Sequence, residues 1–76
     1  MNPFCTATRQ QATEEYQKAI KVLKKIGLGQ EFRKKVEAYA STLKNSKYNT
    51  NEAVLYGNIA AYIRSEKQDM MNALGL

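Results

Sequence analysis

The chain of 76 residues contains no histidine and no tryptophan, and its only cysteine is Cys5. The lack of histidine removes the most common general acid–base catalyst and a principal zinc ligand. A single thiol forms no intrachain disulfide and no structural zinc site. We therefore expect that the protein is not an enzyme and that it binds no cofactor, metal or small-molecule substrate.

Long hydrophobic runs are also lacking. The longest nearly apolar stretch covers residues 53–63, which is far short of the roughly 20 residues that span a bilayer. The N-terminus carries no charged start followed by an apolar run, as a signal peptide would. Because a free thiol suits a reducing compartment, we expect a cytoplasmic protein without a membrane partner.

Proline and glycine are sparse, with one and four residues respectively. Between them the apolar residues recur with a helical period, and no long segment alternates as a strand does. The pattern predicts one all-helical domain over residues 1–76, a small compact bundle of three helices. We expect these helices at about 4–26, 30–43 and 50–64, with a short fourth helix or an extension of the third at about 66–74.

Two signals compete for the start of the first helix. Asn2 followed by Pro3 has the pattern of an N-cap with proline at the first helical position. Thr8 with Gln11 three residues later has the pattern of a capping box. Gly27 suits the left-handed residue that ends this helix.

Similar signals surround the third helix. Asn49, with Glu52 three positions later, predicts its N-cap, and Tyr48 is placed to pack against Ala53 as a hydrophobic staple. The polar segment 65–68 again has the pattern of a cap. It either starts a fourth helix or lies within a longer third one.

Charge is distributed unevenly along the chain. Residues 1–48 hold ten basic and four acidic residues, whereas residues 49–76 hold two basic and three acidic ones. The turn near Gly27 is expected to bring the basic residues of the first two helices into one patch. Such a patch is a solvated face, or it binds an acidic protein surface or nucleic acid. The basic candidates are Lys18, Lys21, Lys25, Arg33, Lys34 and Lys35.

The third helix carries a stripe of small side chains at Ala53, Gly57, Ala61 and Ser65, spaced four residues apart. Such a stripe lets another helix approach closely, and a glycine inside a helix costs about 1 kcal/mol relative to alanine. We expect either one of the chain's first two helices, or a second copy or a partner, to fill this groove. Two neighbours cannot easily cover a helix that is apolar almost all round.

The C-terminal segment is apolar and contains two flexible methionines. Met70, Met71 and Leu74 either fill the core or form an adaptable binding surface. Tyr39, Tyr48 and Tyr62 belong either to the rim of the core or to an interface.

These features favour a small non-enzymatic regulator or inhibitor that docks on a larger protein through a basic patch and an apolar helix face. Small phage- or plasmid-borne modulators of host proteins are similar in size and composition. The alternatives are a nucleic-acid-binding accessory protein that uses the same patch, and a structural subunit that self-assembles through the third helix as a homo-oligomer. Besides the six basic residues, the expected partner-binding residues are Gly57, Ala61, Tyr62, Met70 and Met71.

Overall fold

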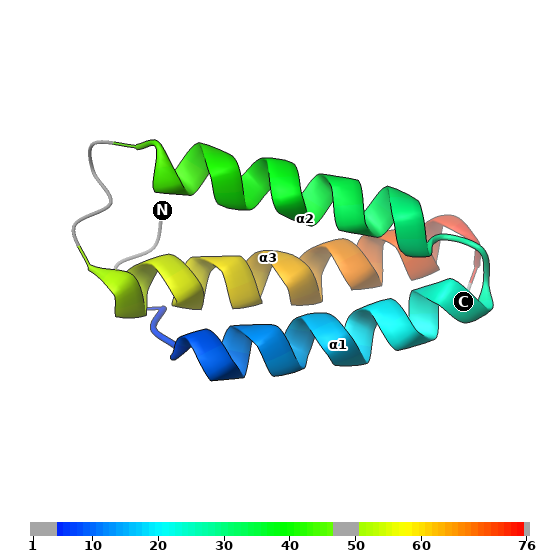
Figure 1. Cartoon of the computed structure of the whole chain (residues 1–76). Coiled ribbons are helices and arrows are strands. Elements are labelled where there is room, and N and C mark those ends of the chain that lie inside the picture. The colour runs from blue at the N-terminus through cyan, green and yellow to red at the C-terminus, as the bar shows by residue number, and fades with distance from the viewer. Residues whose placement is uncertain (1–4, 47–50, 76) are drawn as a thin grey trace.

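The protein, seen in a computed structural model, is described over residues 5–46 and 51–75. It contains three helices, α1 (Arg9–Lys25), α2 (Gly29–Lys44) and α3 (Glu52–Ala73). α1 and α2 form an antiparallel pair, and α3 lies behind them and runs in the same direction as α1 (Figure 1). The described ranges contain no strand. The expected all-α bundle of three helices is confirmed.

The capping box at Thr8 starts α1. The backbone N–H of Gln11 donates to Thr8 Oγ1 at 3.0 Å, and the backbone N–H of Thr8 donates to Gln11 Oε1 at 2.9 Å. Residues 5–8 are not helical. The prediction of a helix that begins near residue 4 is therefore wrong, because the two reciprocal bonds make Thr8 the N-cap, where the helix begins. Asn2 and Pro3 lie outside the described residues.

The turn between α1 and α2 is a Schellman motif. Gly27 has a φ of +80°, as expected for the left-handed residue that follows a helix. The N–H of Leu28 donates to Leu23 O at 2.9 Å, and the N–H of Gly27 donates to Lys24 O at 3.2 Å. These bonds satisfy two of the last carbonyls of α1 and reverse the chain direction so that α2 begins at Gly29.

α3 begins two residues later than an Asn49 cap implies. Its N-cap is Asn51, whose Oδ1 accepts from the N–H of Ala53 at 2.7 Å and from that of Val54 at 3.4 Å. The expected cap at Asn49 is wrong because Asn51 directly precedes the first helical residue and reaches the free N–H groups itself. Asn49 and Tyr48, and with them the expected staple, lie outside the described residues.

α3 then continues without interruption to Ala73. The polar segment 65–68 lies inside the helix and caps nothing. There is no fourth helix in the described ranges, and the alternative of a longer third helix is confirmed. Neither glycine nor proline occurs between residues 58 and 74, so the backbone has no reason to break.

Replacement of the α3 cap tests its contribution to stability. Asn51→Ala is expected to lower the free energy of unfolding by about 1 kcal/mol, because two N–H groups lose their acceptor. Asn51→Asp should retain stability, and Asn45→Ala, exposed at the end of α2, is the matched control. Urea unfolding followed by circular dichroism measures all three. An Asn51→Ala protein as stable as Asn45→Ala would show that the cap contributes nothing.

The core takes its largest enclosed side chains from all three helices. Leu23 of α1, Phe32 of α2 and Ile63 of α3 are almost completely shielded from solvent. Within residues 53–63, only Ala53 is classed as exposed, and the others are buried or half-buried. The stretch is therefore enclosed within a single chain and needs no second copy or partner to cover it, although two neighbouring helices were expected to be insufficient.

The additional cover comes from the segment that precedes α1. A Cβ atom at Gly57 would overlap the backbone of Cys5 and Thr6. The Cys5 thiol donates to Gly57 O at 3.0 Å, and the N–H of Ala7 donates to Ala53 O at 2.9 Å. A non-helical segment of the same chain thus lies directly against Gly57 and is hydrogen-bonded to Ala53 O. At Gly57 the occupant is this segment and not one of the first two helices.

This contact predicts an unusual response to a common substitution. Gly57→Ala, which raises helix stability by about 1 kcal/mol at an ordinary site, is expected to lower the free energy of unfolding by about 1–3 kcal/mol. The physical reason is the overlap with the Cys5–Thr6 backbone. In a chain without residues 1–7 the same substitution should be stabilising. Equal effects in the two backgrounds, measured by urea unfolding, would contradict the contact.

Candidate partner-binding surface

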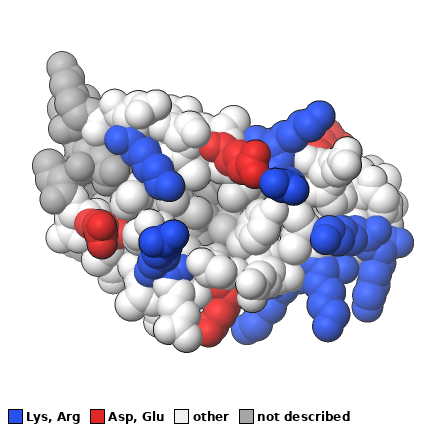
Figure 2. Space-filling model, in the orientation of Figure 1, with Lys and Arg blue, Asp and Glu red and all other residues white. Residues whose placement is uncertain are grey.

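Basic side chains gather at the end of the bundle where α1 ends and α2 begins (Figure 2). Lys24 and Lys25 occupy the last turn of α1, and Lys21 lies one turn earlier. Arg33 and Lys34 follow the first turn of α2. All five side chains are exposed. We call the set of Lys21, Lys24, Lys25, Arg33 and Lys34 the basic end.

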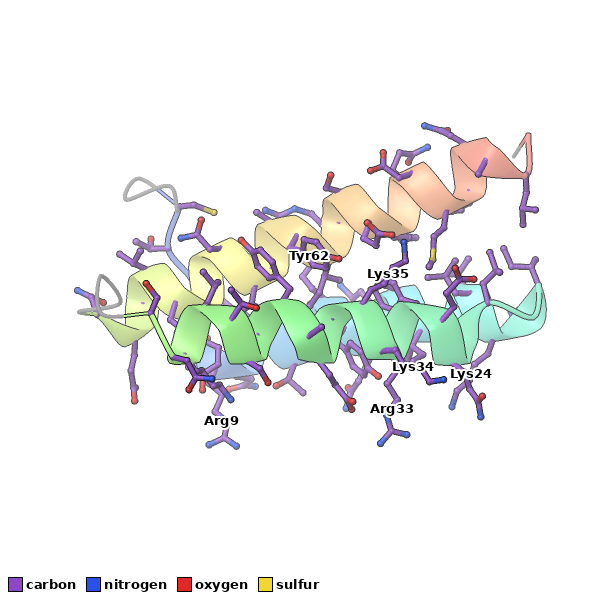
Figure 3. All side chains as sticks on the ribbon, turned by 90° about the horizontal axis from the view of Figure 1, so that it is seen from above. Arg9, Lys24, Arg33, Lys34, Lys35 and Tyr62 are labelled. Carbon is purple, nitrogen blue, oxygen red and sulfur yellow. The ribbon has the colours of Figure 1, made fainter. Side chains whose placement is uncertain are left out.

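Two of the expected basic candidates lie elsewhere. Lys35 Nζ pairs with Glu66 Oε1 of α3 at 3.1 Å, and the Glu66 side chain is only 15% exposed. The hydrogen bond to Glu66 raises the pKa of Lys35 above its ordinary value. Figure 3 shows Lys35 directed toward α3, whereas Arg33 points away from it. Lys18 lines a hollow between α1 and α3 with Arg64, on another side of the bundle.

A groove of about 600 Å³ runs between α1 and α2 beside the basic end. On the α1 side it is lined by Tyr16, Ile20 and Lys24, which are spaced four residues apart and so share one helix face. On the α2 side it is lined by Gly29, Gln30, Arg33 and Glu37. We call this feature the α1–α2 groove. Sequence reasoning missed it, although the spacing of the three α1 residues was a readable signal.

The floor of the α1–α2 groove is partly apolar. Tyr16 and Ile20 are half-buried and pack against the core. The ring of Tyr16 stacks on that of the buried Phe32, with centroids 5.9 Å apart and an interplanar angle of 17°. This stacking fixes the position of one wall, because the Phe32 ring is held in the centre of the core.

Positively charged side chains outnumber negatively charged ones along the α1–α2 groove. Arg33 Nε donates to Glu37 Oε1 at 3.0 Å, and both side chains are more than 60% exposed, so the pair stabilises the fold little. Burial raises the pKa of the Tyr16 phenol, and Arg33 opposes this effect while Glu37 adds to it. With Lys24 added, the lining has a net charge of one positive.

Comparison of the chain with known protein families, curated proteins and solved structures gave no match. Among the described residues, no three acidic or cysteine side chains gather as a metal site would require. In the same ranges, no helix has the length and apolar character needed to cross a membrane.

The expected partner-binding residues of α3 lie apart from the basic end. Gly57 is covered by the segment before α1, and Met70 is buried in the core. Ala61, Tyr62 and Met71 are half-buried. Their role in binding stays a prediction.

Tyr62 contacts α2 through an aromatic stack. Its ring lies on that of Tyr39, with centroids 4.1 Å apart and an interplanar angle of 7°, in the space between α2 and α3 (Figure 3). Burial raises the pKa of Tyr62 above 10.0; Glu66 raises it further, and Lys35 lowers it. The folded protein therefore holds this phenolic proton more tightly than the unfolded chain does.

The raised pKa predicts a loss of stability in alkali. The contribution of Tyr62 is fully present below pH 10.0, its ordinary pKa, and is lost as the pH rises through the higher pKa of the folded state. Ultraviolet titration of phenolate in the wild type and in Tyr62→Phe isolates this group as a difference curve. We expect its midpoint above 10.0, and a midpoint at or below 10.0 would contradict the assignment.

Proposed function

We propose that the protein is a non-enzymatic regulator or inhibitor that docks on an acidic surface of a larger protein through the basic end. The observation that carries this proposal is the set of unpaired cations. Among the described residues, Lys21, Lys24, Lys25 and Lys34 are exposed and form no ion pair, and Arg33 has only an exposed one. Cations clustered in this way attract an acidic partner and accelerate its association.

Helix electrostatics explain only part of this cluster. Lys24 and Lys25 lie at the negative end of the α1 dipole, which stabilises them. Arg33 and Lys34 lie in the first half of α2, near its positive end, where the dipole gives them no such support. Their position is therefore better accounted for by binding than by stability of the helix.

A protein partner fits this surface better than nucleic acid does. The α1–α2 groove contains the carboxylate of Glu37, which repels phosphate, and its one aromatic residue, Tyr16, is half-buried against Phe32. Single-stranded nucleic acid is commonly held by aromatic side chains that are open to stacking. Self-assembly through α3 has lost part of its support, since the chain itself covers the small-residue stripe at Gly57.

We place this activity in the cytoplasm as part of the same proposal. The support is Cys5, a free thiol, which a reducing compartment preserves. One form of this docking function is a small phage-borne modulator that binds a host protein.

The proposal is tested by reversing the charge of the basic-end residues that do not line the α1–α2 groove. Replacement of Lys21, Lys25 and Lys34 by Glu together is expected to abolish capture of a protein partner from cell extract and to reduce its association rate about 10- to 100-fold at low salt. The matched control reverses Arg9, Lys44 and Lys67, which lie outside the basic end and change the net charge equally.

Parallel captures with nuclease, together with sedimentation of the pure protein, separate the alternatives. A partner that survives nuclease, that the basic-end variant loses and that the control retains supports the proposal. Equal retention by both variants overturns it. Loss of all capture after nuclease identifies a nucleic-acid accessory protein, and a defined homo-oligomer without a captured protein identifies a structural subunit.

A further inference from the structure

The α1–α2 groove combines an apolar floor with cationic edges. Tyr16 and Ile20 supply partly exposed apolar surface between the two helices. Lys24 stands on the α1 edge, and Arg33 stands on the α2 edge. Figure 3 shows both cations on the side of the bundle that faces away from α3, so both are accessible to a ligand from solvent.

We propose that the α1–α2 groove binds an acidic amphipathic helix of the partner protein. Its apolar side chains contact Tyr16 and Ile20, and its carboxylates pair with Lys24 and Arg33. This inference rests on the proposed docking function and names the structural element that the partner contributes.

The shape of the groove favours a helix over an extended strand. An added strand needs a sheet edge to satisfy its backbone groups, and the described residues contain no strand. A helix satisfies its own backbone and inserts a ridge of side chains between two neighbouring helices. From Tyr16 to Lys24 the groove extends about 12 Å, which accommodates about two turns of a ligand helix.

The charges of the groove favour carboxylates on that helix. A ligand carboxylate near Lys24 meets an exposed cation that has no ion-pair partner in the described part of the chain. The exposed pair of Arg33 and Glu37 is weak, so the guanidinium can exchange or share its carboxylate partner with the ligand. A basic ligand helix would find only the single carboxylate of Glu37, which Arg33 already neutralises.

A synthetic peptide serves as the probe. It is a fluorescein-labelled, alanine-based helix of about 14 residues, with leucines on one face and glutamates on the two flanking positions. One control peptide has the same composition with the leucines distributed around the helix. A second control has lysine in place of glutamate. Fluorescence anisotropy measures the affinity of the full-length protein for each.

Two aliphatic residues of α1 provide matched variants. Ile20→Gln changes the floor of the groove, whereas Val22→Gln changes a half-buried residue that does not line it. We expect Ile20→Gln to weaken binding of the patterned acidic peptide about tenfold, and Val22→Gln to leave it within about twofold. Thermal unfolding of both variants confirms that each is folded at the temperature of the assay.

The outcomes separate this inference from the proposed function. Preference for the patterned acidic peptide, lost in Ile20→Gln alone, supports the groove. Equal binding of patterned and scrambled acidic peptides, or equal affinities of the two variants, overturns it. In that case the proposed function still stands if the reversal of Lys21, Lys25 and Lys34 abolishes capture. Tighter binding of a single-stranded oligonucleotide than of any peptide overturns both.

Discussion

Enclosure of α3 is the constraint on which the rest of the structure depends. This helix has almost no polar face along residues 53–63, so water must be excluded from nearly all of its circumference. α1 and α2 cover two sides, and the extended segment at Cys5 and Thr6 covers another by lying directly on Gly57. A small domain without disulfides thereby places most of its apolar surface in one core.

Local patterns in the sequence were sufficient to predict the helices. The recurrence of apolar residues every three or four positions indicated each helix, and Gly27 and the Thr8–Gln11 box gave correct ends because the signals and their effects lie within one turn. The cap of α3 was misplaced because Asn49 and Asn51 are both plausible by type. Only the path of the backbone decides between two such neighbours.

Contacts between distant segments were not readable. The stripe at Gly57 correctly indicated a close approach, but an extended segment has no periodicity that would mark it as the occupant. Similarly, Lys35 directly follows Arg33 and Lys34 in the sequence but is directed toward α3, because successive residues differ by about 100° around a helix. Lys35 then pairs with Glu66, far along the chain, and the α1–α2 groove exists only once two helices have packed.

Within the described residues, the ion pairs between helices both involve α3, on the far side of the proposed binding surface. Lys35 pairs with Glu66 across α2 and α3, and Arg64 pairs with Glu15 across α1 and α3. No such pair crosses from α1 to α2 in the described ranges; there the basic end and the groove remain open to solvent. The exposed cations of the basic end thus lie outside the core, whereas Tyr16 and Ile20 pack against the core and also line the groove. For this reason the charge of the proposed binding surface can change without loss of the core, which is the physical basis for testing function separately from folding.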